Sequence, residues 1–361
     1  MFVAIATAVR QGVAPAAIYL RTMSYSRQTP TALGERPLTA ARDAAVVCDL
    51  DPLRVLAVAG SDAAAFLNGQ LSIDTIDFPA GACRYACFNS PKGRMLANFV
   101  VWREPSTEGR FLILLPGELA PAVAKRLSMY VLRSKVTIAD ATDEIARVGI
   151  GGPDATRVAD ALWGAHPAPF ELRTFGACTL LALPGPRFVA VAPAAEAEAI
   201  RGKLLRHANA APFGVWRWLT IRAGVAVITG ATQDMFVAQT ANWDILHGID
   251  FQKGCYTGQE IIARTQYLGR LKERAFVFHA AIDGVRPGER LYSEAFGDQP
   301  CGTVVDAAAA PESGCDLIAV LQTVAAERGD PHVRALDGPA LTPLPLPYAI
   351  PAPSAPRGRQ A

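Results

Sequence analysis

The stretch Phe251-Gln-Lys-Gly-Cys-Tyr-Thr-Gly-Gln-Glu260 contains the most informative local pattern in this 361-residue chain. Thr257 and Glu260 have the Thr-x-x-Glu spacing of a capping box, in which each side chain bonds a free backbone N–H of the first helical turn. Tyr256 and Ile261 stand at the two positions of a hydrophobic staple. The pattern therefore predicts a helix that starts at Gly258.

Cys255 comes about two residues before this predicted helix. Unpaired N–H groups and the helix macrodipole favour an anion there, and Lys253 adds a second positive charge. Both influences favour a thiolate, which is the reactive form of cysteine and the form that binds metals. We therefore predict an activated thiol at Cys255 and a supporting role for Lys253. The alternative is an ordinary buried cysteine, because lone cysteines are among the most buried residues.

Composition narrows the class of protein. The length and the 51% hydrophobic content allow two or three domains with a sizeable core. With 35 basic and 33 acidic residues the net charge is only +2, so direct RNA contact is not expected. No apolar run approaches the roughly 18 residues of a membrane span, so a soluble protein is expected. Seven irregularly spaced cysteines favour a reducing compartment.

The first residues allow two interpretations. No acidic residue precedes Glu35, and Arg10, Arg21 and Arg27 punctuate an alanine-rich stretch, as in mitochondrial transit peptides. Alternatively, Met23 is the true start of a bacterial protein. Localisation is accordingly predicted as bacterial cytoplasm, with the mitochondrial matrix as the alternative. In both cases residues 1–44 are expected to be a disordered extension or a misassigned start.

Hydrophobic patterns predict an α+β chain with a change of character near residue 273. Before it, strand patterns alternate with helix patterns, and the turn Asn89-Ser-Pro-Lys-Gly93 joins two apolar runs as a hairpin. After it, short strands separated by turn residues predict a small C-terminal β-barrel. Residues 348–361 are proline-rich and are expected to form a disordered tail.

The segment Lys253-Gly-Cys-Tyr-Thr-Gly-Gln-Glu260 resembles the motif of the YgfZ family, which is related to the T-protein (aminomethyltransferase) of glycine cleavage. The resemblance covers nearly the whole core, including residues 58–70, 91–95, 134–137, 221–225 and 239–242. It implies tetrahydrofolate-binding proteins that support iron–sulfur cluster assembly or repair. It also implies three domains around a central folate cavity. These would be residues 45–143 plus 210–270, an inserted domain at 144–209, and the barrel at 271–347.

The resemblance also implies a set of site residues. Trp216 matches a tryptophan that lines the folate site, although it could equally be a plain core aromatic. Weaker candidates for binding the cofactor, tetrahydrofolate or a one-carbon-loaded derivative, are Gln239, Asn242, Lys92, Tyr256, Gln259 and Glu260. The implied partners are folate and iron–sulfur enzymes or cluster-assembly proteins, with iron–sulfur tRNA-modifying enzymes as candidate clients.

One departure separates the chain from aminomethyltransferases. Ala97 and Asn98 align with an aspartate pair of the T-proteins, and neither can carry negative charge or act as a general base. Enzymatic activity is therefore left open. Three hypotheses remain: a folate-dependent accessory factor for iron–sulfur enzymes, a one-carbon transferase or demethylase, and a folate-independent scaffold. No metal site is predicted, because the histidines are far apart and Cys83 and Cys87 are expected to be buried in a strand.

Overall fold

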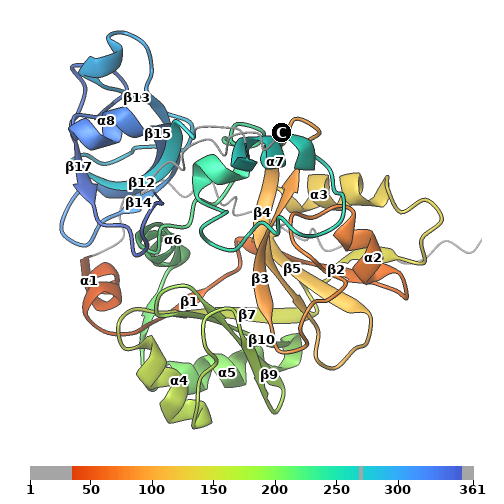
Figure 1. Ribbon diagram of the computed structural model, residues 1–361. Coiled ribbons are helices and arrows are strands. Elements are labelled where there is room, and N and C mark those ends of the chain that lie inside the picture. The colour runs from red at the N-terminus through yellow and green to blue at the C-terminus, as the bar shows by residue number, and fades with distance from the viewer. Residues whose placement is uncertain (1–34, 268–270, 352–361) are drawn as a thin grey trace, which may run out of the picture.

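The structure is a computed structural model that describes residues 35–267 and 271–351. Three β-sheets surround one central helix, α6 (Phe213–Arg222), as Figure 1 shows. The α+β class predicted from the sequence is therefore confirmed. The two interpretations of the start of the chain concern residues 1–34, which lie outside the described residues.

The first sheet has five strands in the order β3-β4-β5-β2-β6. They are β2 (Leu53–Ala59), β3 (Cys83–Asn89), β4 (Met95–Arg103), β5 (Arg110–Pro116) and β6 (Thr137–Asp140). The helices α2 (Ala63–Asn68) and α3 (Ala120–Ser128) follow β2 and β5. β3 and β4 form the predicted antiparallel hairpin, with Cys83 opposite Trp102. β4 is buried along nearly its whole length, which explains its continuous apolar run.

The second sheet has six strands in the order β11-β1-β7-β10-β9-β8. They are β1 (Val46–Asp49), β7 (Ile145–Gly151), β8 (Leu172–Phe175), β9 (Cys178–Leu183), β10 (Arg187–Pro193) and β11 (Asn209–Ala211). The helices α4 (Ala155–Trp163) and α5 (Ala197–Leu204) cover its outer face, α5 following the 3-10 turn η2 (Ala194–Glu196). Val158 and Leu204 pack there against Val148 and Ile150.

The third sheet has six strands in the order β16-β13-β14-β15-β12-β17 and curls into a half-barrel. They are β12 (Glu273–Ala280), β13 (Arg290–Tyr292), β14 (Gly302–Ala309), β15 (Cys315–Gln322), β16 (His332–Val333) and β17 (Leu341–Leu344). Two further elements are η4 (Glu294–Phe296) and α8 (Thr323–Arg328). A single bridge between His332 and Ala340 joins the two ends of the sheet. The small β-barrel predicted from the sequence is thus found in part, as a curled half-barrel with the short strands β16 and β17 at its two ends.

Helix α6 holds the three sheets together. All of its residues from Val215 to Ile221 are buried, because other elements cover the helix on every side. Its polar members have partners on the half-barrel: Arg217 forms a buried ion pair with Asp306, and Trp218 Nε1 donates to Asp316 Oδ2 over 2.8 Å. Burying these groups is tolerated because each is paired.

The packed chain extends beyond both predicted ends of the core. Residues predicted to be a disordered extension form α1 (Glu35–Asp43), whose Leu38 and Ala41 are buried. At the other end Tyr348 falls in the predicted disordered tail, yet its hydroxyl donates to the Gly224 carbonyl over 2.6 Å. Both corrections have one physical reason, which is that apolar groups from the ends cover the surface around α6.

Candidate functional site

The side chain of Lys253 anchors the loop that contains Cys255 to the end of α2. The Lys253 ammonium is buried and donates to the carbonyls of Asn68 and Leu71, the latter over 2.7 Å, at the end of α2. It also lies 4.7 Å from the centroid of the Tyr256 ring. Burial lowers the pKa of Lys253 to about 8. The structure therefore shows Lys253 as an anchor for the loop. Its predicted effect on the thiol stays a prediction.

The helix after the loop, α7 (Gln259–Tyr267), begins one residue later than predicted. Gly258 has a φ of +82°, a left-handed conformation that suits glycine. In place of the predicted capping box, the Gln259 side-chain oxygen accepts from the Tyr256 N–H over 3.3 Å. Among the described residues, neither Thr257 nor the exposed Glu260 forms a side-chain hydrogen bond. The capping-box prediction is wrong because the left-handed Gly258 separates Thr257 from the first helical turn.

The hairpin turn between β3 and β4 packs against the start of α7. A Cβ atom on Gly258 would lie 2.6 Å from the Ser90 carbonyl oxygen and 2.9 Å from Gly93 Cα. A Cβ on Gly93 would in turn lie 2.8 Å from Ile261 Cβ. The hairpin turn and the start of α7 are thus in contact, although they lie far apart in the sequence. Lys92 is exposed at the tip of this turn, close to the motif.

Cys255 is the one exposed cysteine among the seven, all of which lie in the described ranges. Burial raises the pKa of the Cys83 thiol to about 12 and raises the pKa of Cys87 further. These two cysteines are buried in β3, as predicted. The exposure of Cys255 excludes the alternative interpretation of it as a small core residue. Any thiol chemistry of the native chain would therefore start at Cys255.

Gln239 and Asn242 are fully buried and hold neighbouring segments in place. Gln239, in η3 (Ala238–Ala241), donates to the Ile262 carbonyl over 2.7 Å and so ties η3 to α7. Asn242 donates to the Ala275 carbonyl over 2.8 Å and to the Tyr348 hydroxyl over 3.2 Å. Neither residue lines the central cavity described next. Their cofactor-binding roles stay predictions.

A cavity of about 60 Å³ lies between the first sheet, the second sheet and α6. Its wall is mainly aromatic and aliphatic, and it includes the predicted Trp216 together with Tyr85, Trp243, Asn98 and Arg187. The Tyr85 and Trp243 rings lie 5.1 Å apart. Flat apolar walls with a few polar groups are typical of sites for ring-shaped ligands.

Arg187 is the central polar residue of this cavity, and the sequence analysis missed it. Its guanidinium donates to Thr220 Oγ1 over 2.9 Å and to the Tyr85 hydroxyl over 3.2 Å. It lies 5.6 Å from the centroid of the Trp216 ring, within the range of a cation–π contact. Arg187 thereby joins β10, α6 and β3. An arginine at the start of an apolar strand was the available clue, since a buried charge requires partners.

The Asn98 amide is occupied by backbone contacts. Its Nδ2 donates to the Ala226 carbonyl over 2.7 Å, and its Oδ1 accepts from the Ile228 N–H over 2.9 Å. Both Ala97 and Asn98 are buried in β4. A carboxylate in place of Asn98 could accept from Ile228 but could not donate to Ala226. The amide therefore fixes the segment after α6 against β4.

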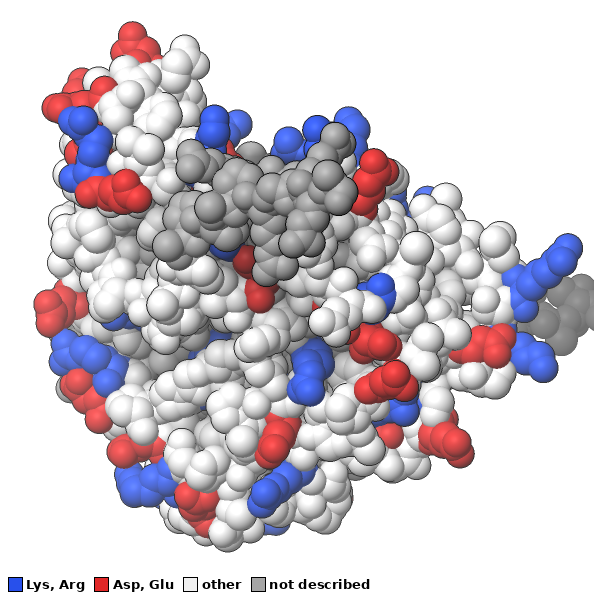
Figure 2. Space-filling view, viewed as in Figure 1, with Lys and Arg blue, Asp and Glu red and all other residues white. Residues whose placement is uncertain are grey.

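Clustered metal ligands and membrane-spanning helices were sought throughout the described residues. Within residues 35–267 and 271–351, no group of three or more His, Cys, Asp or Glu residues is arranged to hold a metal ion. None of the helices in these ranges combines the length and the apolar character that crossing a membrane would require. Figure 2 shows acidic and basic side chains interspersed over the face in view.

Comparisons with known proteins place this architecture. Residues 7–191 match the model of the GCVT N-terminal domain. The chain is 32% identical to a tRNA-modifying protein YgfZ from Sodalis glossinidius, over 87% of this chain and 96% of that protein. It is 30% identical to the protein of the same name from Klebsiella pneumoniae, with the same coverage.

Among solved structures, the chain resembles the glycine cleavage system aminomethyltransferase T from Bartonella henselae. The TM-score is 0.68 at 17% identity, and the match covers 88% of this chain and 90% of that one. At this identity the likeness shows a shared fold. Together with the motif at Lys253–Glu260, the matches show that the chain belongs to the YgfZ family and contains the GCVT N-terminal domain.

Proposed function

We propose that this protein binds a reduced folate in its central cavity and acts as an accessory factor for iron–sulfur cluster assembly or repair, with Cys255 as its working thiol. The observation that carries the proposal is the exposure of Cys255 within the family motif, while the other six cysteines are buried. The names of these relatives connect them with tRNA modification. We therefore propose iron–sulfur tRNA-modifying enzymes as clients.

The chemistry of the cavity wall suits a pterin ring. Trp216 and Tyr85 offer flat faces, and Arg187 offers hydrogen-bond donors to ring acceptors. The volume of about 60 Å³ is below the 300 Å³ or more of typical ligand pockets, so side chains must move apart for a ring to enter. The proposed occupant is tetrahydrofolate or a one-carbon-loaded derivative. The chain's own residues would bind and orient it.

Ordinary aminomethyl transfer is not proposed. Aminomethyl transfer would need a carboxylate at position 98, which is an asparagine in this chain. The Asn98 amide already forms hydrogen bonds with the backbone of Ala226 and Ile228. Ala97 offers no ionisable group. No proton acceptor therefore stands at this point of the cavity wall. The folate site would serve recognition or regulation, and chemistry would occur at Cys255.

The proposed cellular setting is the bacterial cytoplasm. The relatives described above are bacterial, which favours this alternative over the mitochondrial matrix. A cytoplasmic setting keeps Cys255 reduced, as a working thiol requires. The proposed partners are reduced folate and iron–sulfur enzymes or cluster-assembly proteins.

Complementation tests the proposal. A strain that lacks the gene would receive the wild-type chain, Cys255→Ala or Cys301→Ala, and the activity of an iron–sulfur tRNA-modifying enzyme would be measured at matched protein levels. We expect restoration by the wild type and by Cys301→Ala, since Cys301 is buried in the half-barrel. We expect little restoration by Cys255→Ala. Full restoration by Cys255→Ala would rule out the thiol role.

A further inference from the structure

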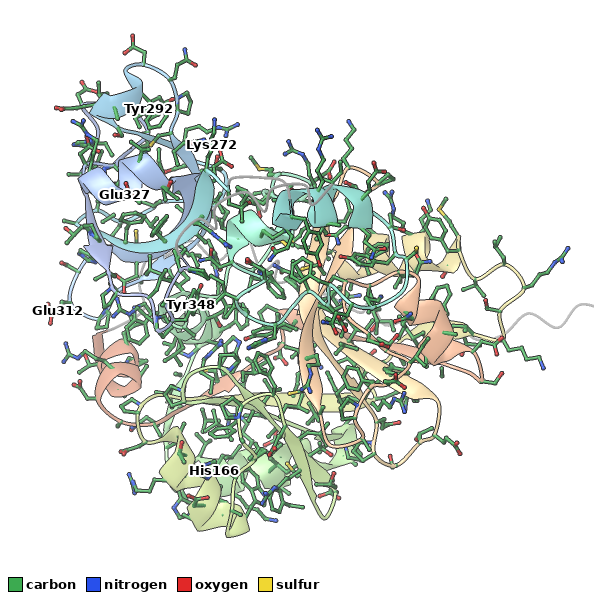
Figure 3. All side chains as sticks on the ribbon, viewed as in Figure 1. His166, Lys272, Tyr292, Glu312, Glu327 and Tyr348 are labelled. Carbon is green, nitrogen blue, oxygen red and sulfur yellow. The ribbon has the colours of Figure 1, made fainter. Side chains whose placement is uncertain are left out.

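The loop between α3 and β6 contains the two most exposed large apolar side chains among the described residues. Leu132 is 87% exposed and Met129 is 66% exposed, and Tyr130 between them is 38% exposed. We call these three residues and Arg133 the α3–β6 tip. Figure 1 shows the loop at the right-hand edge of the molecule, and Figure 3 shows side chains there pointing away from the ribbon. Apolar groups gathered on a surface indicate a place that another molecule covers.

The fold holds the α3–β6 tip in a defined shape. The Ser134 N–H donates to the Val131 carbonyl over 2.8 Å, which closes a turn around Leu132. Leu132 has a φ of +46°, a left-handed conformation that leucine rarely adopts. The Lys135 N–H then donates to Asp62 Oδ2 over 2.7 Å and so ties the loop to the start of α2. The exposed leucine is therefore presented by an anchored loop.

The charge around the α3–β6 tip is positive. The segment from the start of α3 to the third residue of β6 contains four basic residues and no acidic residue. Lys125 and Arg133 are exposed and Arg126 is half-buried, and none of the three has an ion pair or a side-chain hydrogen bond within the described ranges. The fourth, Lys135, lies close enough to Asp62 to lower the pKa of that carboxyl. Three cations are thus available to an acidic partner.

The residue types of the α3–β6 tip favour a protein as this partner. Met, Tyr and Arg are enriched at the centres of protein interfaces, and the tip contains one of each. The aliphatic side chain of Leu132 can neither pair with a phosphate nor stack on a base as an aromatic ring does, so nucleic acid is the poorer match. A second copy of this chain would bring like charges together. The matching surface is an apolar cleft surrounded by carboxylates.

The α3–β6 tip and the Cys255 loop are attached to opposite ends of one short helix. Asp62, which precedes α2, accepts from the backbone of Lys135, and Asn68 at the end of α2 accepts from Lys253. With six residues, α2 is about 9 Å long. A standard interface covers about 800 Å² of each partner. A protein docked on the tip would therefore also lie beside the Cys255 loop.

We infer that the α3–β6 tip is the docking surface for the iron–sulfur client enzyme, through an acidic face with an apolar cleft on that enzyme. The inference rests on the proposed function, because the client is taken from there. Met129 and Leu132 would fill the cleft, and Arg126 and Arg133 would pair with the carboxylates around it. Docking at this surface would hold the client beside the loop that contains Cys255.

Direct binding tests the docking surface. The probe is the purified iron–sulfur tRNA-modifying enzyme whose activity the complementation assay measures, titrated with the full chain at low and at high salt. We expect saturable binding that weakens at high salt, because salt screens charge pairs at an exposed interface. The double variant Met129→Ser, Leu132→Ser should bind about tenfold more weakly or worse. Arg126→Glu with Arg133→Glu should do the same, whereas lysine at both positions keeps the charge and should retain most of the affinity.

The matched control is Val324→Ser, which removes an apolar side chain that is 52% exposed on α8. Figure 3 labels Glu327 of the same helix at the opposite end of the molecule from the α3–β6 tip. This variant should bind the client as the wild type does. Circular dichroism checks the folding of each variant, and the salt dependence of wild-type binding does not depend on any of them.

The outcomes separate this inference from the proposed function. No binding of the client, binding that is independent of salt, or unchanged binding by the tip variants would each overturn the docking surface. Binding of total tRNA, or dimerisation of the chain, that the same variants abolish would overturn the client as the occupant. Full restoration of client activity by Cys255→Ala would instead overturn the thiol role and leave the docking surface to be judged on these titrations.

Discussion

Gly93 and Gly258 lie against each other, so that the β3–β4 hairpin turn contacts the first turn of α7 with no side chain between them. A Cβ on Gly258 would approach Gly93 Cα to 2.9 Å. Both residues also have positive φ angles, +69° and +82°. This contact fixes where the loop with Cys255 meets the first sheet. The position of the thiol thus depends on two glycines that lie far apart in the sequence.

Alanine at position 258 should displace the loop. The left-handed backbone costs alanine about 1 to 2 kcal/mol, and the clash with Ser90 brings the expected loss in unfolding free energy to about 3 kcal/mol or more. The matched control is Gly284→Ala, since Gly284 has a similar φ of +76° and nothing within 4 Å of its Cβ position. Urea unfolding measures both. Equal losses in the two variants would contradict the close contact.

Native protein should contain one fast-reacting thiol. Burial raises the pKa of Cys48, Cys178, Cys301 and Cys315, as it does for Cys83 and Cys87, whereas Cys255 is exposed. A chromogenic disulfide reagent should therefore label one equivalent rapidly and the rest only after denaturation. Cys255→Ser should abolish the fast phase. A fast phase that remains in this variant would show that another cysteine is accessible.

Asn98→Asp should destabilise the chain at neutral pH. The carboxylate would face the Ala226 carbonyl that Asn98 now bonds, and an unsatisfied buried group costs about 1 to 3 kcal/mol. Protonation would restore a donor, so the folded-state pKa of the new carboxyl would be raised. Stability is then lost as pH rises, and the deficit should be smaller at pH 5 than at pH 8. Thermal unfolding at both values checks this, and a pH-independent deficit would contradict it.

Lys253 should make stability depend on pH in the alkaline range. Burial lowers its folded pKa to about 8, so above pH 8 the unfolded chain binds more protons at this site than the folded chain. The contribution of Lys253 to the free energy of unfolding therefore rises from about pH 8 to about 10.4. Lys253→Met lacks this rise, and its deficit relative to the wild type should widen over that range. Urea unfolding at several pH values measures it. A constant gap would show that the lysine is not desolvated.

Local sequence patterns predicted much of the fold. The β3–β4 hairpin and the burial of Cys83 and Cys87 in β3 both follow from patterns among residues a few positions apart. The error at α7 was local too, because the spacing of Thr257 and Glu260 does not reveal the backbone angle of Gly258. Capping boxes require both the residues and the backbone conformation.

The interior of the site could not be predicted from such patterns. Arg187 donates to Tyr85, which is 102 residues away in the sequence, and Trp218 of α6 donates to Asp316 of the third sheet, which is 98 residues away. Contacts of this kind depend on how the sheets pack around α6, and the hydrophobic periodicity of the sequence does not predict that packing. The prediction of a reactive thiol at Cys255 came from its local sequence pattern, and the predicted folate role of Trp216 came from the family resemblance. Their geometry came from the structure.

We propose two separate sites in this protein, a folate-binding cavity beside Trp216 and a working thiol on the surface at Cys255. The most direct test is a tetrahydrofolate titration followed by tryptophan fluorescence, performed on the wild type before and after alkylation of Cys255. We predict saturable quenching with the same affinity in both forms. Absence of binding in the unmodified protein, or loss of binding on alkylation, would contradict the account.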